Sequence, residues 1–108
     1  MTIEILYVAD CPHYEPAALE IRDALQQEQQ PAEVKHIEIR DQAMAEALGF
    51  LGSPTIRING IDIVASARGS EGFGLCCRFY GTSDGTKAGP SAAMIRSAIR
   101  EIGLHANE

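Results

Sequence analysis

Two strand-like segments flank one amphipathic helix at the start of this chain, and this pattern limits its possible folds most strongly. Residues 2–9 are mostly apolar and rich in β-forming side chains, and residues 32–39 alternate apolar with charged ones. Between them, residues 14–29 place apolar side chains at helical spacing. Because a helix crosses between the strands, we expect them to be parallel neighbours in one sheet.

The next segments predict a short helix followed by a β-hairpin. Asp41 is a suitable N-cap for a helix over residues 42–48, and Gly49 is expected to end that helix. Residues 55–58 and 61–65 are strand-like and flank Asn59-Gly60, which is a strong signal for a tight hairpin turn. We expect these two strands to join the same sheet.

A glycine-rich segment, residues 66–89, separates the hairpin from a last helix. We expect this segment to be a long loop, interrupted by one apolar run at residues 75–80. The last helix is predicted to begin at Pro90-Ser91 and to end at Gly103. The predicted fold class is therefore α/β, with the order β-α-β-α-β-β-α, a mixed sheet, helices on both faces and a loop insertion before the last helix.

Composition limits the organisation and the partners of the chain. A length of 108 residues favours a single domain over residues 1–108, and 45% hydrophobic residues are typical of a globular protein. The net charge of −6 argues against nucleic acid or an anionic membrane as a partner. No apolar run is long enough to span a membrane, and the first residues lack the basic region of a signal peptide. We expect a soluble cytoplasmic protein.

The three cysteines are Cys11, Cys76 and Cys77. In the cytoplasm thiols stay reduced, so catalytic, metal-binding or incidental roles are favoured over structural disulfides. Cys11 lies between the first strand and the first helix, where unpaired N–H groups and the helix dipole favour the thiolate and lower a thiol pKa. Cys11 is therefore predicted to be reactive; the alternative is a small residue that fills a turn.

The neighbours of Cys11 affect this prediction in different directions. Pro12 suits the first position of a helix, where its missing N–H costs nothing. His13, if protonated, would favour the thiolate, whereas the carboxylate of Asp10 would oppose it. Pro16 fits only if the regular helix starts near Tyr14 or is kinked there.

The order of elements, together with Cys11-Pro12-His13-Tyr14 and Gly52-Ser53-Pro54-Thr55, resembles the thioredoxin/glutaredoxin superfamily over about residues 2–65 and 90–103. The resemblance implies a thioredoxin-like fold, with a cis-proline at Pro54 packed against the active-site cysteine. It also implies that the Ser53 backbone pairs with an extended substrate chain. The alternative is an ordinary trans turn proline. Tyr14 replaces the second cysteine of the Cys-x-x-Cys pattern, so we expect a monothiol site whose mixed disulfide needs another thiol to resolve it.

Cys76 and Cys77 are candidates for that resolving thiol. Adjacent residues of a strand point in opposite directions, so only one of them would face Cys11 and the other would be buried as a small apolar side chain. The alternative is that both are structural residues of a short edge strand. Arg78 beside them could lower a thiol pKa or bind a substrate carboxylate; otherwise it is a solvated surface charge.

A soft-metal role is a second interpretation of the cysteines. If Cys11, Cys76 and Cys77 converge, they suit Hg(II), Cu(I) or Zn(II), although they lack a standard zinc spacing. Two cysteines with Asp10 are the kind of set that organomercurial lyases use. Short thioredoxin-like chains with Asp-Cys-Pro-His and Leu-x-Cys-Arg segments, which this chain resembles, are sometimes labelled alkylmercury lyases. His36 and His105 are interpreted as incidental.

The favoured function is that of a thiol-disulfide oxidoreductase-like protein. Cys11 would attack a small or protein disulfide, a peroxide or another soft electrophile, and Cys76 or Cys77 would resolve the adduct. Glutathione is the candidate co-substrate, and no cofactor or bound metal is expected. The alternatives are a soft-metal or organomercurial protein of mercury resistance and a non-catalytic thioredoxin-like adaptor. The candidate catalytic residues are Cys11, Cys76, Cys77, Asp10 and His13, and the candidate substrate-binding residues are Pro12, Tyr14, Ser53, Pro54 and Arg78.

Overall fold

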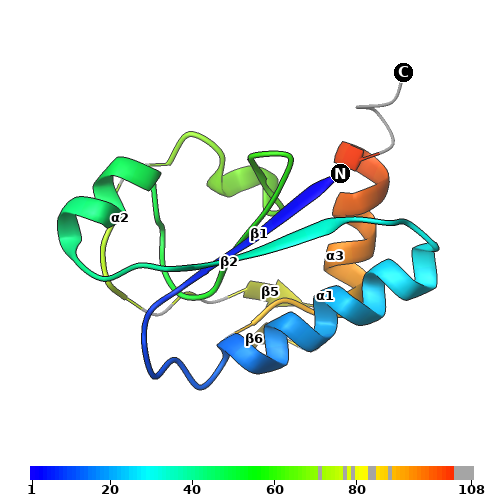
Figure 1. Ribbon diagram of the computed structural model, residues 1–108, viewed down its shortest axis with the longest axis horizontal. Coiled ribbons are helices and arrows are strands. Elements are labelled where there is room, and N and C mark those ends of the chain that lie inside the picture. The colour runs from blue at the N-terminus through cyan, green and yellow to red at the C-terminus, as the bar shows by residue number, and fades with distance from the viewer. Residues whose placement is uncertain (71, 77, 79, 83–84, 88, 104–108) are drawn as a thin grey trace.

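One mixed β-sheet organises the chain, and its strands follow the order β2-β1-β3-β4 (Figure 1). The computed structural model describes residues 1–70, 72–76, 78, 80–82, 85–87 and 89–103. The four strands of the sheet are β1 (Thr2–Tyr7), β2 (Glu33–Glu38), β3 (Thr55–Ile58) and β4 (Ile61–Asp62). β1 pairs in parallel with β2 and antiparallel with β3, and β3 pairs antiparallel with β4. The predicted α/β class, strand directions and hairpin are confirmed.

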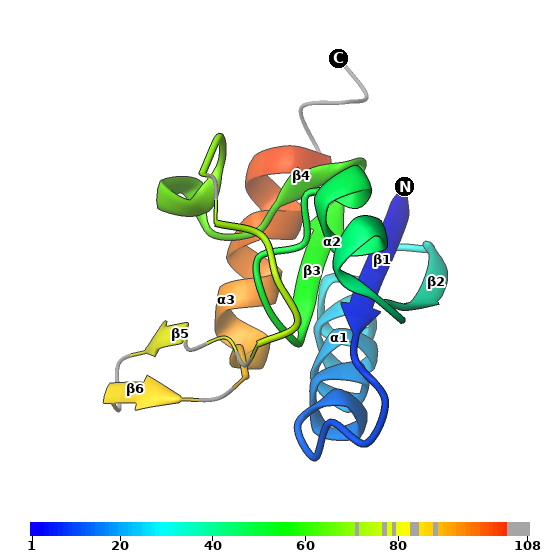
Figure 2. The same ribbon diagram turned by 90° about the vertical axis from the view of Figure 1, so that its left-hand side faces the viewer.

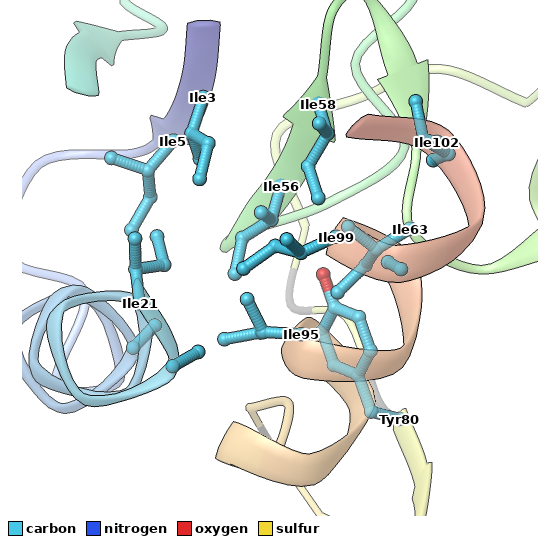
Figure 3. Close-up of a cluster of buried hydrophobic side chains, with 13 residues drawn as sticks. Ile3, Ile5, Ile21, Ile56, Ile58, Ile63, Tyr80, Ile95, Ile99 and Ile102 are labelled. Atoms are coloured by element: carbon cyan, nitrogen blue, oxygen red, sulfur yellow. The ribbon is translucent and has the colours of Figure 1, made fainter. Parts of the chain in front are cut away.

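Helices cover both faces of this sheet, as the sequence predicted. On one face, α1 (Tyr14–Glu28) and α3 (Ala92–Ala98) enclose the larger core, and Ile3 and Ile5 of β1 point into it (Figure 3). On the other face, α2 (Gln42–Leu48) packs Ala45 against Leu6 of β1. The period-2 alternation of a strand explains why neighbouring residues of β1 enter different cores. Within the described residues, no helix is long and apolar enough to cross a membrane.

Local sequence signals fix several of the element boundaries. The side chain of Asp41 accepts a hydrogen bond from the Met44 N–H at 2.8 Å, and Gly49 ends α2 in the left-handed conformation. Asn59 and Gly60 both have positive φ values, which the tight turn between β3 and β4 requires. These predicted boundaries are confirmed.

Two predictions about these elements need correction. α1 begins at Tyr14, as its amphipathic spacing predicted, and Pro16 lies in its first turn, but Pro12 precedes the helix instead of occupying its first position. β4 is shorter than predicted because the Asp62 side chain accepts the Val64 N–H at 2.9 Å and diverts the chain into the 3₁₀ turn Ala65–Ala67. Helix α3 begins after its N-cap Ser91 and continues into a π-helical turn, Ile99–Gly103, so the helical segment ends at Gly103 as predicted.

The glycine-rich insertion contains structure that the sequence analysis missed. Strands β5 (Tyr80–Thr82) and β6 (Gly85–Lys87) form a separate antiparallel hairpin. Figure 2 shows this hairpin beside the start of α3 and away from the four-stranded sheet. Short strands with glycine and no apolar alternation give little periodic signal, which explains the incorrect prediction of a loop.

Candidate functional site

The backbone positions Cys11 in a tight turn between β1 and α1. The Cys11 N–H donates to the Val8 carbonyl at 3.3 Å, and its own carbonyl accepts the Tyr14 N–H at 3.3 Å. Asp10 has a φ of 61°, a left-handed conformation that aspartate tolerates better than most residues. Cys11 is half-buried and is a free thiol. Main-chain geometry in this turn therefore presents the Cys11 side chain.

A hollow of about 450 Å³ opens beside Cys11. The residues that line it come from the end of β1, the turn and the first turn of α1: Tyr7, Val8, Asp10, Cys11, Pro12, Tyr14, Glu15 and Pro16. It contains Asp10, Pro12 and Tyr14 of the predicted site residues. His13 is the N-cap residue of α1, where its side chain makes no capping hydrogen bond. Two carboxylates and no lysine or arginine line this hollow, so its surface favours neutral or cationic ligands.

Two tyrosine rings form one wall of the hollow. Tyr14 stacks on Tyr7 with ring centroids 3.7 Å apart and an interplanar angle of 8°. A 2.7 Å hydrogen bond joins the Tyr14 hydroxyl to Nδ1 of His36, which lies on β2. Burial, and after it the Tyr7 ring hydroxyl, raise the pKa of Tyr14 above its ordinary value. His36, which was interpreted as incidental, therefore contacts Tyr14 in the wall of the hollow.

The Ser53–Pro54 peptide bond is cis, as predicted, and the preceding serine is linked to the Cys11 turn. The Ser53 hydroxyl accepts the Val8 N–H at 3.2 Å, and Val8 is the residue whose carbonyl receives the Cys11 N–H. Ser53 and Pro54 are both buried. The structure thus connects the two sequence motifs, residues 11–14 and 52–55, through Val8.

The glycine-rich insertion also forms hydrogen bonds with Ser53. We call residues 73–80 the strap; residues 77 and 79 lie outside the described part of the chain. The Ser53 N–H donates to the Cys76 carbonyl at 2.8 Å, and the Ser53 carbonyl accepts the Arg78 N–H at 3.1 Å. Both main-chain groups of Ser53, which the resemblance assigned to an extended substrate, are therefore occupied by the chain itself.

Cys76 lies on the strap but not in a strand. It is exposed and free, and its sulfur is 3.8 Å from the Leu51 carbonyl and 3.6 Å from the Gly74 carbonyl. The edge-strand interpretation is thus wrong for Cys76, and Cys77 lies outside the described residues. Among the residues that the structure describes, no three His, Cys, Asp or Glu side chains gather as a metal site.

Arg78 belongs to the interior of the protein. Its guanidinium makes two hydrogen bonds to Asp62, at 2.7 and 2.8 Å, and a third to the Thr55 hydroxyl at 3.3 Å. Both partners of the ion pair are 8% exposed, and the guanidinium lies 4.7 Å from the Tyr80 ring centroid. Burial acts to lower the pKa of Arg78, but the Asp62 hydrogen bonds and the electrostatic effects of Tyr80 and Asp62 together outweigh it, so the net pKa is raised. The interpretation of Arg78 as a solvated surface charge is therefore wrong, because its guanidinium forms a buried ion pair with Asp62.

The structure thus brings Cys11, Asp10, Pro12 and Tyr14 to one hollow and ties that hollow to the cis-proline loop. It places Cys76 on the strap, which is hydrogen-bonded to Ser53 of the same loop. Arg78 fixes the strap to the interior through its ion pair with Asp62. Comparisons with protein-family models, with curated proteins and with solved structures found no significant match to the chain.

Proposed function

We propose that this protein is a thioredoxin-like thiol-disulfide oxidoreductase with Cys11 as its nucleophile. The observation that carries the proposal is the free, half-buried Cys11 thiol beside a hollow of about 450 Å³. The supporting features are the order of the sheet, the cis-Ser53–Pro54 bond and the hydrogen bond from Val8 to Ser53. A structural cysteine would need neither a hollow nor a braced turn.

The chemistry begins with the Cys11 thiolate attacking one sulfur of a disulfide. The substrate S–S bond breaks, a mixed disulfide forms on Cys11, and the leaving sulfur takes up a proton from solvent. Tyr14 occupies the place of a local second thiol, so the mixed disulfide persists until another thiol attacks it. That thiol is an external one such as glutathione or, by our proposal, a cysteine of the strap.

Cys76 is the described candidate for the internal resolving thiol. The strap and the Cys11 turn are both hydrogen-bonded to Ser53, which supports a short path between their cysteines. Resolution would oxidise Cys11 and Cys76 to an internal disulfide and release the second half of the substrate as a thiol. Cys77 is the other candidate from the sequence.

The test compares Cys11→Ser with Cys76→Ser and Cys77→Ser after exposure to a small disulfide. Trypsin separates the thiols, because Cys11 lies in the peptide 1–22 and both strap cysteines lie in the peptide 69–78. We expect Cys11→Ser to abolish reduction of the disulfide and the mixed disulfide on peptide 1–22. Replacement of the true resolving cysteine should make that mixed disulfide accumulate. An unchanged reduction rate in Cys11→Ser would show that Cys11 is not the nucleophile, and no reduction by the wild type would favour a non-catalytic adaptor.

A soft-metal function has one observation in its favour. Cys11 and Cys76 are both free, and both lie on segments bonded to Ser53. Thiolates bind Hg(II) strongly. If mercury is the substrate, one equivalent of Hg(II) should protect both cysteines from alkylation. Protection of only one of them, or a need for one equivalent per thiol, would exclude a shared site.

A further inference from the structure

The strap pairs with the main chain of Ser53, the residue that the resemblance assigns to an extended ligand chain. Polypeptides that bind in extended form use free main-chain N–H and C=O groups of their host. The Ser53 N–H donates to the Cys76 carbonyl at 2.8 Å, and the Ser53 carbonyl accepts the Arg78 N–H at 3.1 Å. Both main-chain groups of Ser53 are therefore already bonded to the strap. Further along, the Gly74 N–H donates to the Phe50 carbonyl at 3.2 Å. The backbone next to the nucleophile is thus already paired.

Buried side chains keep the strap in this position. Arg78 and Asp62 form an ion pair with two hydrogen bonds, and each side chain is 8% exposed. Tyr80 is part of the larger core and its hydroxyl donates to the Pro54 carbonyl (Figure 3). At the other end, the Gln42 amide donates to the Phe73 carbonyl at 2.8 Å. A ligand could displace the strap only by breaking the buried ion pair, which leaves charges without partners.

The Cys11 hollow is the part of this region that stays accessible. Its volume of about 450 Å³ is in the range of small-molecule sites, and its walls are the stacked rings of Tyr7 and Tyr14. The described residues that line it come from β1, the Cys11 turn and α1. A small molecule can therefore approach the sulfur without displacing the strap.

We infer that the strap is an internal substitute for an extended ligand, and that it restricts Cys11 to small soluble disulfides while excluding polypeptide ones. This inference rests on the proposed function. In the selected reaction, Cys11 attacks R–S–S–R, the substrate S–S bond breaks, Cys11–S–S–R forms and RSH leaves. The small disulfide is itself the oxidant, so no further reactant is needed.

The test measures two rates of mixed-disulfide formation on peptide 1–22 by mass spectrometry. One probe is 2-hydroxyethyl disulfide, and the other is an unstructured peptide whose cysteine is joined to 2-mercaptoethanol. The same two rates in urea-unfolded protein give the intrinsic preference of the Cys11 thiol. The rate with the small probe divided by the rate with the peptide probe should be about tenfold or more higher in folded than in unfolded protein. A factor of this size corresponds to the free energy of one to two hydrogen bonds.

A matched variant loosens the strap. The double substitution Asp62→Asn and Arg78→Met removes the ion pair without leaving a charge buried, and thermal unfolding confirms that the variant is folded. Amide hydrogen exchange at positions 53 and 78 reports whether the strap has opened. With faster exchange there, the rate ratio should fall towards the unfolded value.

Three results would overturn the inference, and they are distinguishable from one another. Equal ratios in folded and unfolded wild-type protein, with protected amides at positions 53 and 78, refute the strap's role while leaving the proposed function intact. A folded-state Cys11 that reacts with neither probe, although it reacts when unfolded, refutes the proposed function as well. An open strap with an unchanged high ratio also contradicts the inference.

Discussion

The Cys11 turn and the strap both bond to Ser53, yet they are stabilised by different means. The turn is held by main-chain hydrogen bonds and presents its side chains to a hollow and to solvent. The strap is held by the buried pair of Arg78 and Asp62 and by Tyr80 in the core. The segment that looked like a loose glycine-rich loop is thus the one anchored by interior charge. The segment proposed to react keeps its side chains available.

The largest difference should appear when each region loses one charge. Arg78→Met leaves the Asp62 carboxylate buried without its partner, and we expect the free energy of unfolding to fall by about 3–5 kcal/mol. Glu15→Gln in the exposed first turn of α1 should change it by less than about 0.5 kcal/mol. Urea denaturation measures both. Adding Asp62→Asn to Arg78→Met should recover part of the loss, and no recovery would mean that unpaired charge is not its cause.

Alkaline pH should weaken the strap through Tyr80. Burial raises the pKa of the Tyr80 hydroxyl above its ordinary value of 10.0, so folding favours the neutral phenol. This contribution is present below pH 10 and is lost as the pH rises towards the raised pKa. Tyr80→Phe removes the hydrogen bond to Pro54 and should cost about 1 kcal/mol at neutral pH. Above pH 10 the variant should lose less stability than the wild type, and equal losses in urea titrations would contradict the assignment.

A smaller and more local effect is expected where the two regions meet. Ser53→Ala removes the hydroxyl that accepts the Val8 N–H, and it should lower the free energy of unfolding by about 1 kcal/mol. The Val8 amide should exchange faster with solvent, while the amide at position 53 should stay protected by the strap. Ser66→Ala, at an exposed position of the 3₁₀ turn, is the control. Unchanged exchange at Val8 would show that the serine does not brace the turn.

The smallest effect should follow from the aromatic wall of the hollow. Tyr14→Phe keeps the ring stacked on Tyr7 but removes the hydrogen bond to His36, and stability should change by less than about 0.5 kcal/mol. Tyr14→Ala also removes the stack and should cost about 0.5–1.5 kcal/mol more. Thermal unfolding orders the two variants. If Tyr14→Phe costs as much as Tyr14→Ala, the hydroxyl and not the ring holds this wall.

Local signals in the sequence predicted most of the sheet and its helices. Asp41 and Gly49 bound α2 as expected, and the Asn59-Gly60 turn joins β3 to β4. These features depend on residues adjacent in the chain, so the side chains themselves determine them. The hairpin β5–β6 was missed because its strands are short and glycine-containing, and they pair only with each other.

The candidate site was predictable in part for the same reason. Cys11 follows from its place between a predicted strand and a predicted helix, and the cis state of Pro54 was implied by the resemblance, but the hydrogen bond between Tyr14 and His36 depends on the register that sets β2 beside β1. Likewise, nothing adjacent to Arg78 in the chain reveals that Asp62 is its partner. Long-range partners are set by how elements pack, which a local pattern does not contain.

The sequence by itself determined the order of the elements that form the four-stranded sheet and its helices, the turn that presents Cys11 and the absence of a second thiol at Tyr14. These follow from periodicity, capping and residue identity, which act over a few neighbouring residues. Only the tertiary structure decided that the strap occupies the backbone of Ser53 and that Arg78 is an interior charge. A buried ion pair and a backbone pairing across the fold form only where folding brings distant segments together and removes water from both partners.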